Sequence, residues 1–510
     1  KFHVTTAAGE VLFKSDPFAF AAERPPETAS IVFESRFEWS DQDWMEQRQA
    51  RDPLRVPFSI YECHIGSWKK NLSYREIAHE LSDYVTKLGF THIEFLPIAE
   101  HPFRGSWGYQ VSAYFAPSSR FGDPDDFRYL VNHMHRCGIG VIADWVPAHF
   151  PKDDFALARF DGDPLYEHSD PRVAEQPDWG TLTFDFGRPE VRNFLVANAL
   201  WWIEEFHLDG LRVDAVSSML YLNFSREPGE WAPNVHGGSE DLEAVSLLKE
   251  LNTIVYARNP SVLMIGEEST AWPGVSRPVY MGGLGFGAKW NLGWMHDTLK
   301  YLKTPPQDRA REQRRLTFGP LYQWDENFVL PLSHDEVVHG KGSLFGKMPA
   351  ANAIIHLRAL FAWMWAHPGR PLLFMGGEFG QIREWSHDRE LDWELLGKSD
   401  HLQLQDLVSL LNQLRNRHRA FWELDFDKDG FEWFDADEDG RGCFSFRRYS
   451  ADRAETVLCT ANFSAESHKV ALPPGEWKVL MDTMAAKTWG TRDDEIDLSP
   501  SNVVWLVPIP

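Results

Sequence analysis

The segment at residues 209–216, DGLRVDAV, places charged residues inside an apolar stretch. Its leucine and valines are typical of a buried strand, yet Arg212 and Asp214 lie two positions apart and therefore on the same face. Burying a guanidinium and a carboxylate in a sheet is costly unless the two groups are paired. The pair is either a buried ion pair that closes the fold or part of a reactive site, and its neighbours decide between the two.

Polar residues also follow other apolar strands that the sequence predicts. Asp144 and His149 follow the third strand, Glu267 the fifth, and His334 and Asp335 the sixth. Two carboxylates that flank a glycosidic bond can cleave it, because one attacks the anomeric carbon while the other protonates the leaving oxygen. Carboxylates at several consecutive strand ends favour a reactive site over a structural ion pair.

The strands that carry these residues alternate with helix-like segments. The predicted strands are SIYECHI, HIEFLPI, GVIADWV, GLRVDAV, VLMIGEE, FVLPLS and PLLFMGG, and the predicted helices include YREIAHELSDYVTKLG, VRNFLVANALWWIEEF and QDLVSLLNQLRNRH. This pattern indicates a parallel sheet covered on both faces. Seven clear strands and a weak eighth favour an α/β fold of the (β/α)8 TIM barrel type, since no G-x-G-x-x-G follows the first strand. Active sites of such barrels lie at the C-terminal ends of the strands, so we expect the polar residues to face one cup.

The composition divides the chain into three regions. The barrel is expected at residues 58–420, with a short Asp- and Pro-rich insertion after the third strand at about residues 148–187. Residues 1–57 are rich in Pro, Ala and Glu and are predicted to be irregular. Residues 421–510 change to short strands and turns, which predicts a C-terminal all-β sandwich domain.

Charge and cysteine content exclude several functional classes. The chain has 51 basic and 75 acidic residues, a formal net charge of −24, which would repel nucleic acid and anionic membranes. Its 4 cysteines have no C-x-x-C spacing and are typical of reduced thiols. No apolar run is long enough for a membrane span or a signal segment, so we expect a cytoplasmic protein. Most of the 22 tryptophans belong in a core, but such a surplus also suits stacking on sugar rings.

Four regions of the chain resemble the signature regions of the family 13 glycoside hydrolases, the α-amylase superfamily. They are ADWVPAH, DGLRVDAV, IGEEST and LPLSHDE, in that order. Five further stretches resemble the glycogen branching enzymes of this family: YECHIGSW, GSWGYQ, FGRPEVRNFLVANALWW, KWNLGWMHDT and SHDEVVHGKGSL. The resemblance extends from about Asp16 to the end of the chain, and residues 1–57 resemble only the tail of the β-sandwich carbohydrate-binding module that usually precedes the barrel.

The resemblance implies a role for each candidate residue. Asp214 would be the nucleophile, Glu267 the general acid and base, and Asp335 a third carboxylate that grips ring hydroxyls in the distorted transition state. Tyr109 would stack under the sugar at the cleavage point. Glu268 is the rival of Glu267, but strand alternation turns it the other way. The resemblance gives four further residues as polar partners of the carboxylates: Asp144, His149, Arg212 and His334.

Several positions depart from related enzymes. Calcium-binding α-amylases usually have Asn where this chain has Ala148, and Lys-His where it has Ser217 and Ser218. Gly266 replaces an alanine that is common in branching enzymes. The turns DFDKDG and DADEDG begin like calcium loops but lack the closing Glu. We therefore expect neither a metal nor a cofactor.

We predict a glycogen branching enzyme. It would cleave α-1,4-glucan chains such as amylose or glycogen by a retaining double displacement and transfer the segment to a glucan 6-hydroxyl, forming an α-1,6 branch. The alternative is an α-glucan hydrolase of the same superfamily, of the amylase, debranching or trehalose-releasing type, in which water is the acceptor. A glucan-binding protein without catalysis is disfavoured because all three catalytic carboxylates are present. We expect a monomer that binds no nucleic acid and no membrane.

Overall fold

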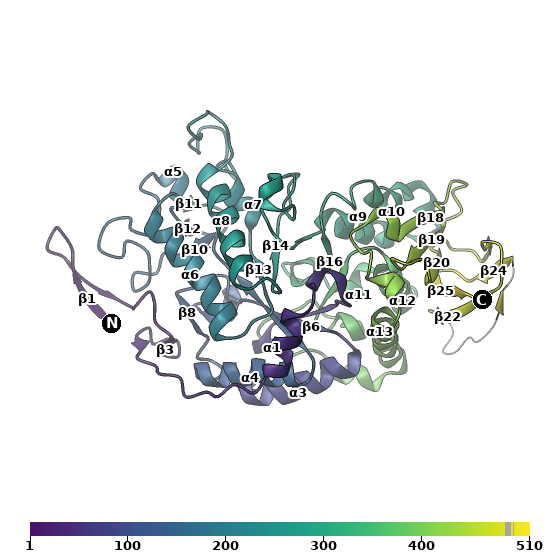
Figure 1. Cartoon of the computed structure of the whole chain (residues 1–510), viewed down its shortest axis with the longest axis horizontal. Helices are drawn as coiled ribbons and strands as arrows, with labels where there is room; N and C mark the ends of the chain where they lie inside the picture. The colour runs from purple at the N-terminus through teal and green to yellow at the C-terminus, as the bar shows by residue number, and fades with distance from the viewer. Residues whose placement is uncertain (485–490, 493, 510) are drawn as a thin grey trace. The chain divides into compact units, whose positions relative to one another are not determined.

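The computed structural model describes residues 1–484, 491–492 and 494–509 and contains a closed barrel of eight parallel strands (Figure 1). The barrel order is β13-β14-β15-β16-β17-β5-β6-β9. The strands are almost entirely buried, as expected for a parallel sheet covered on both faces. Their bounds are β5 (Ile60–Cys63), β6 (His92–Phe95), β9 (Gly140–Trp145), β13 (Gly210–Val213), β14 (Leu263–Gly266), β15 (Ala288–Trp290), β16 (Phe328–Leu332) and β17 (Arg370–Phe374).

The eighth barrel strand, whose position was not predicted, is β15, which lies between β14 and β16 in the barrel. The FVLPLS strand is therefore the seventh, and the prediction that His334 and Asp335 follow the sixth strand is wrong. β15 spans only 3 residues, with Lys289 at its centre, so no apolar run marks it. Between β14 and β15 the described chain forms one short 3-10 turn and no α-helix, so the usual alternation is broken at this point.

Longer helices follow most of the barrel strands. Three of them, α3, α6 and α13, confirm the three helices predicted from periodicity. Asp123 caps α4 and Asp241 caps α8, each accepting a hydrogen bond from a backbone N–H three residues on. The bounds are α3 (Tyr74–Leu88), α4 (Pro124–Arg136), α6 (Pro189–Glu205), α8 (Leu242–Arg258), α9 (Leu292–Lys303), α12 (Ala353–Ala366) and α13 (Ser399–Arg417). Short helices are α2 (Ile65–Trp68), α5 (Pro171–Ala174), α7 (Val216–Leu220), α10 (Arg314–Thr317) and α11 (Leu344–Lys347). No helix of the described chain is long and apolar enough to cross a membrane.

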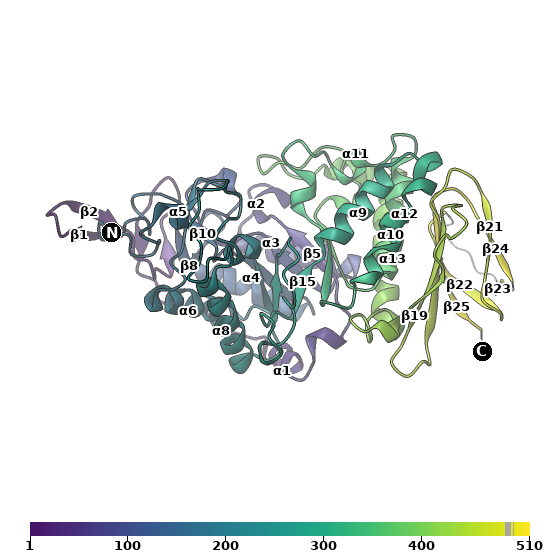
Figure 2. The same cartoon turned by 90° about the horizontal axis from the view of Figure 1, so that it is seen from above.

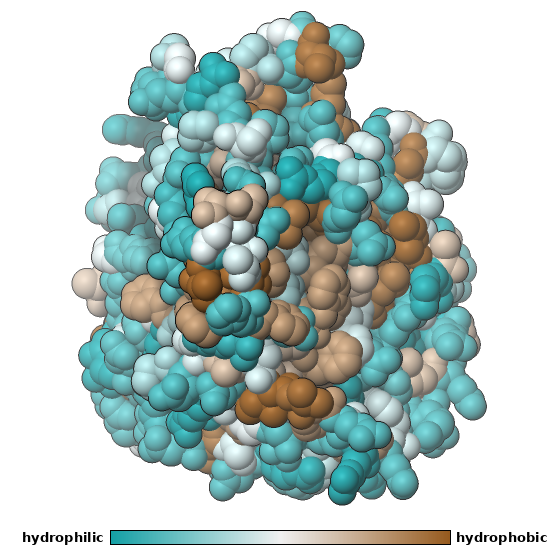
Figure 3. All heavy atoms as spheres, turned by 90° about the vertical axis from the view of Figure 1, so that its left-hand side faces the viewer, coloured by the Kyte–Doolittle hydropathy of each residue, from teal (hydrophilic) through white to brown (hydrophobic). Residues whose placement is uncertain are grey.

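The amino-terminal segment is more ordered than its composition indicates, so the prediction of an irregular region is partly wrong. It contains the hairpins β1 (Phe2–Thr5) with β2 (Val11–Lys14) and β3 (Ala21–Ala22) with β4 (Ser30–Ile31), and helix α1 (Gln42–Gln49). The buried Lys14 ammonium donates to the carbonyl of Ala158 at 2.7 Å, which ties the hairpin to the insertion. Phe13 is 61% exposed, and the face in Figure 3 shows apolar patches among hydrophilic side chains.

The insertion after β9 folds into its own small sheet, in the order β10-β12-β11. These strands are β10 (His149–Phe150), β11 (Glu175–Gln176) and β12 (Thr181–Thr183). Two further excursions leave the barrel: β7 (Ala99–Glu100) with β8 (Ala113–Pro117) after β6, and residues 221–241 after α7. The composition indicated only the insertion after β9, because the other two excursions lack a run of Asp and Pro residues.

The carboxyl-terminal strands confirm the predicted all-β domain (Figure 2). A six-stranded sheet has the order β18-β19-β20-β25-β22-β23, and β21 pairs with β24. Apolar side chains from both sheets, among them Leu458, Val470, Trp477 and Leu498, form the domain core. The bounds are β18 (Phe431–Asp435), β19 (Cys443–Tyr449), β20 (Thr456–Asn462), β21 (His468–Ala471), β22 (Trp477–Asp482), β23 (Thr491–Arg492), β24 (Glu495–Leu498) and β25 (Asn502–Pro508).

The chain divides into two compact units. One comprises Lys1–Arg51, Cys63–Asp83 and Ile93–Lys289, and the other comprises Asp52–Glu62, Tyr84–His92 and Trp290–Pro510.

A buried charged cluster in the first unit uses Asp209, the first residue of DGLRVDAV. The imidazole of His135 lies between two carboxylates, with Nδ1 at 2.7 Å from Asp41 and Nε2 at 2.9 Å from Asp209. Arg48 and His207 also contact these carboxylates. Burial alone would lower the pKa of His135, but the facing carboxylates of Asp209 and Asp41 raise it above the usual 6.5.

We expect this cluster to stabilise the fold less as the pH rises. Because the folded pKa of His135 is raised, its contribution is fully present below pH 6.5 and is lost as the pH rises through the folded pKa. His135→Gln should therefore lower the melting temperature clearly at pH 6 and much less at pH 9. Equal losses at the two pH values would contradict a buried imidazolium.

Candidate active site

Arg212 lies at the centre of a cluster of carboxylates on three adjacent barrel strands. Its Nη1 donates to both oxygens of Asp144 at 2.7 Å and to Oδ1 of Asp214 at 2.9 Å. Its Nη2 contacts Oε2 of Glu267 at 3.0 Å. Burial alone would lower the pKa of Arg212, but the charges of Asp144, Glu267 and Asp214 raise it well above its usual range. The guanidinium therefore stays charged and fixes three carboxylates at once.

The strand register explains why these groups meet. In β13, Arg212 pairs with Asp144 of β9, and Val213 pairs with Gly266, the last residue of β14. Asp214 and Glu267 each follow the last residue of their strand, so both leave the barrel at the same level. The burial of Arg212 is compensated by ion pairs to several strands, which is the condition for placing a charge inside a sheet.

A strained residue follows Asp214. Ala215 has a left-handed backbone with φ 53°, which costs a non-glycine residue about 1–3 kcal/mol. Its N–H donates to Oε2 of Glu267 at 2.8 Å. The turn therefore holds the Glu267 carboxylate beside Asp214, and both side chains remain reachable from solvent, with 11% of Asp214 and 20% of Glu267 exposed.

Glu268 has a different environment from Glu267. It is fully buried and its Oε2 pairs with the ammonium of Lys289 in β15 at 2.6 Å. Its other oxygen accepts hydrogen bonds from the hydroxyl of Ser217 and the backbone N–H of Thr270. Glu268 thus ties β14 to β15, whereas Glu267 contacts Arg212.

Tyr109 reaches the cluster from the loop after β6. Its hydroxyl donates to Oδ2 of Asp144 at 2.5 Å and lies 3.4 Å from Nη1 of Arg212. The preceding Gly108 has φ 105°, and a Cβ there would lie 2.3 Å from the carbonyl oxygen of Pro97. Only glycine fits this position, which places Tyr109 over the strand ends.

His149 and Trp179 border the nucleophile candidate. Nε2 of His149 lies 3.8 Å from Oδ2 of Asp214. Burial lowers the pKa of His149 to about 3, so this imidazole is neutral at neutral pH. The indole of Trp179, in the insertion, lies 4.6 Å from the imidazole between ring centroids and is 37% exposed. Trp179 was not predicted as a site residue, because no feature of the polar loop around it distinguishes it from the other tryptophans among the 22 of the chain.

A second polar cluster follows β16 in the other unit. Nδ1 of His334 lies 2.6 Å from Oε1 of Glu62, and its Nε2 lies 3.4 Å from Oδ1 of Asp335. Ser333 also donates to Glu62 at 3.0 Å. His334 and Glu62 are buried, while 46% of the Asp335 side chain is exposed. Glu62 was not predicted, although a carboxylate inside the apolar strand IYEC is the same signal that marked Arg212.

The predicted residues therefore form two groups. One group lies within the first unit, where Arg212 directly contacts Asp144, Asp214 and Glu267. Tyr109 and His149 lie at the edge of this group. His334 and Asp335 form the other with Glu62.

The described residues contain no group of three or more His, Cys, Asp or Glu side chains arranged to hold a metal ion. In the turn DADEDG, Oδ1 of Asp437 already accepts hydrogen bonds from the backbone N–H groups of Gly442 and Cys443. Ala148, at the position of the usual calcium ligand, is buried and offers no side-chain oxygen.

We expect activity to survive exhaustive chelation, since Arg212 supplies the positive charge that orders the carboxylates. The assay is glucan turnover after dialysis against EDTA. Lost activity that returns with added calcium would contradict this expectation.

Comparison with known proteins first defines the class. The family model for the alpha amylase catalytic domain matches residues 35–162, and a model described as a domain of unknown function, DUF3459, matches residues 433–505. A putative alpha amylase from Salmonella typhimurium superposes with a TM-score of 0.74 at 19% identity, covering 99% of this chain and 89% of that one. A pullulanase from Bacillus acidopullulyticus gives 0.73 at 16% identity, covering 98% and 66%. At such identities the likeness shows the fold, an α-amylase-type barrel.

Curated relatives then narrow the class. The 1,4-alpha-glucan branching enzyme GlgB of Thermobifida fusca is 57% identical over 94% of this chain and 64% of its own length. The enzymes of the same name from Nocardia farcinica and Mycobacterium bovis are 54% and 53% identical, over 99% and 100% of this chain and 71% and 73% of theirs. The chain belongs to the GlgB family of 1,4-α-glucan branching enzymes. It spans slightly less than two thirds of the Thermobifida fusca relative.

Proposed function

We propose that this chain is the catalytic part of a 1,4-α-glucan branching enzyme, which cleaves an α-1,4 bond and transfers the released segment to a 6-hydroxyl of glucan. The observation that carries the proposal is one guanidinium, Arg212, bound to the candidate nucleophile Asp214 and the candidate acid Glu267 through different nitrogens. This arrangement keeps the two carboxylates close, as a retaining double displacement requires.

In the first displacement, Asp214 attacks the anomeric carbon. Arg212 holds Oδ1 at 2.9 Å, which leaves Oδ2, on the side of His149, as the attacking oxygen. Glu267 gives its proton to the leaving glycosidic oxygen, and a glycosyl ester forms on Asp214. When Asp214 loses its charge in the ester, Arg212 is still compensated by Asp144 and is not left unpaired.

In the second displacement, Glu267 acts as a base. Its carboxylate takes the proton of an incoming 6-hydroxyl, whose oxygen attacks the anomeric carbon and releases Asp214. The two inversions restore the α configuration and give an α-1,6 bond. All atoms and protons are supplied by the glucan and the two carboxylic groups, so no cofactor is required.

The fate of the ester depends on which acceptor reaches it. Water is present at about 55 M, but a positioned hydroxyl can reach an effective molarity of about 10⁵ M or more. Trp179 offers an exposed ring face beside His149. Such a face binds a sugar ring by stacking, and this binding energy is not available to a water molecule. We assign Trp179 and Tyr109 to sugar-ring contacts on the two sides of the cluster.

Asp335 is assigned to the ring hydroxyls of the bound sugar. Its carboxylate is half exposed, and His334 is fixed by the buried Glu62, so that Nε2 faces Asp335. Both groups follow a strand of the same closed barrel as Asp214, and catalytic residues of such barrels come from several strand ends.

The same proposal places the protein in the cytoplasm as a monomer. The formal net charge of −24 disfavours binding to anionic membranes, and all four cysteines are free thiols.

Amylose is the substrate that tests the proposed activity. Transfer should remove the blue iodine colour while the number of reducing ends stays nearly constant, because each cleaved bond is replaced by a new one. A debranching enzyme added afterwards should release short linear chains. Reducing ends that rise in step with the loss of colour would identify a hydrolase instead.

A further inference from the structure

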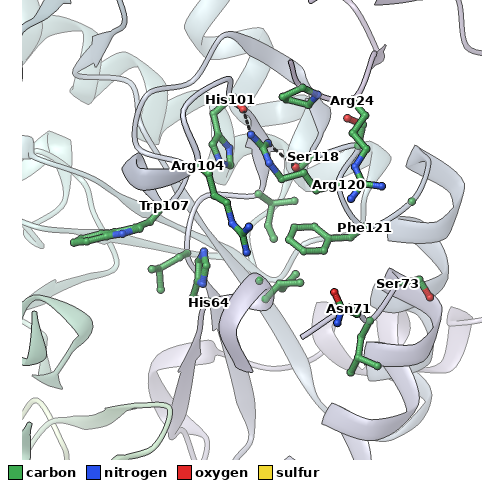
Figure 4. Close-up of a pocket in the computed structure, with 18 of the residues that line it drawn as sticks. Arg24, His64, Asn71, Ser73, His101, Arg104, Trp107, Ser118, Arg120 and Phe121 are labelled. Atoms are coloured by element: carbon green, nitrogen blue, oxygen red, sulfur yellow. Dashed lines mark hydrogen bonds between the residues drawn. The ribbon is translucent and has the colours of Figure 1, made fainter. Parts of the chain in front are cut away.

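A cavity of about 880 Å³ lies in the first unit, beside the loop that carries Tyr109 (Figure 4). Its walls come from residues 24–26, 64–76, 96–107 and 118–122. A volume of this size suits a small organic molecule rather than a single ion. The lining residues include none of the carboxylates around Arg212, so the cavity is distinct from the candidate active site.

Positive charge dominates the wall of this cavity, although the whole chain is acidic. The cations are Arg24, Lys69, Lys70, Arg104 and Arg120, against the single carboxylate of Glu76. A local excess of one sign in a hollow site focuses the field on a ligand of the opposite sign.

Two of these cations are already neutralised. Arg120 pairs with Glu100 at 2.6 Å, and Lys69 pairs with Glu80 at 2.5 Å. The one carboxylate of the wall, Glu76, accepts hydrogen bonds from the backbone N–H and the hydroxyl of Ser73 and keeps its negative charge. Arg24 and Arg104 together outweigh the charge of Glu76, so the wall keeps an excess of positive charge.

Arg104 and Arg24 carry that excess most clearly. Within the described part of the chain, neither guanidinium has an ion pair or a hydrogen bond. In Figure 4 the Arg104 side chain extends into the cavity between His64 and Phe121, and Arg24 reaches toward it from the opposite side. Both arginines are exposed, and their guanidinium donors match the oxygen geometry of a phosphate or a carboxylate. A phosphate accepts more of these donors than a carboxylate does.

The remaining wall offers flat apolar surface. Phe121 lies next to Arg104, and Trp107 stands at the rim. An aromatic face beside a cationic wall suits a ring that carries an anionic group, because the ring can stack while the phosphate meets the arginines.

We propose that this cavity binds a phosphomonoester carried on a sugar or nucleoside ring, with Arg104 and Arg24 as its phosphate contacts. Arg104 opens the 3-10 turn Arg104–Ser106, which leads directly through Trp107 and Gly108 to Tyr109. A ligand bound to Arg104 therefore contacts the same segment that positions the hydroxyl of Tyr109 against the carboxylate of Asp144. The proposal does not depend on the branching reaction, since it concerns binding alone.

Isothermal titration at constant ionic strength tests the site. The probes are glucose 6-phosphate, AMP and inorganic phosphate, with glucose and maltose as neutral controls. We expect saturable binding of glucose 6-phosphate or AMP at a stoichiometry of one, and the tighter of the two identifies the ring that the wall prefers. Inorganic phosphate should bind more weakly, because it makes no ring contact.

Charge-removing variants locate the binding. Arg104→Gln and Arg24→Gln should each weaken binding of the phosphomonoester by about tenfold or more, since hydrogen bonds to charged groups are among the strongest. Arg136→Gln, at the exposed end of α4, removes the same charge elsewhere and should leave binding unchanged. The melting temperature of each variant shows that it is folded.

Three outcomes would overturn the proposal. They are no saturable binding of either phosphomonoester, binding that Arg104→Gln and Arg24→Gln leave intact, and binding of maltose with the same dependence on the arginines. The last would mark the cavity as a glucan-binding surface.

Discussion

Asp214→Asn is expected to lower kcat by about 10³-fold or more and to leave the protein folded, because an amide cannot form the glycosyl ester. The fold should survive because Arg212 keeps its bonds to Asp144 at 2.7 Å and its contact with Glu267 at 3.0 Å. The measurement is turnover of amylose together with the circular dichroism spectrum and melting temperature.

Asp308→Asn is the matched control for this variant. Asp308 is an exposed carboxylate of the second unit outside both polar clusters, so its amide should have wild-type activity. If Asp214→Asn kept a tenth of the wild-type rate, Asp214 would not be the nucleophile.

The two adjacent glutamates should respond in opposite ways to the same chemical change. Glu267→Gln removes the proton donor and is expected to lower kcat by about 10² to 10⁴-fold with little effect on stability. Glu268→Gln leaves Lys289 without a full countercharge in a buried site, which typically costs about 3–5 kcal/mol of stability. Its activity per folded molecule should remain near wild type.

A donor with a good leaving group separates the two displacements. Fluoride departs from an α-maltosyl fluoride without being protonated, so Glu267→Gln should still release fluoride from it, whereas Asp214→Asn should not. The assignment of the acid would be wrong if Glu268→Gln, fully folded, lost turnover while Glu267→Gln kept it.

Sequence alone predicted the barrel and most of the first polar cluster. Long apolar strands separated by amphipathic helices have few stable arrangements, and a charged residue inside such a strand needs a partner, as Arg212 does. Because parallel strands end at one face of the barrel, the polar residues that follow the strands could be assigned to one region from the sequence alone.

What the sequence missed has identifiable physical causes. β15 has 3 residues with Lys289 in the middle, so its strand character comes from pairing in the barrel and not from its own composition. Glu62 was overlooked because its partner His334 lies 272 positions away, and only the closed barrel joins β16 and β17 to β5. Trp179 depends on the fold of the insertion, whose short strands β10, β11 and β12 have no clear periodicity.

The central claim is that the glycosyl ester on Asp214 is transferred to a sugar hydroxyl and not to water. The most direct measurement counts both kinds of product in one sample: new α-1,6 linkages by the proton NMR signals of their anomeric hydrogens, and new reducing ends by a chemical assay. For amylose treated with the purified chain, we predict close to one new α-1,6 linkage for each α-1,4 bond lost, with almost no new reducing ends. Loss of α-1,4 bonds matched by an equal number of reducing ends, without new α-1,6 signals, would contradict the account.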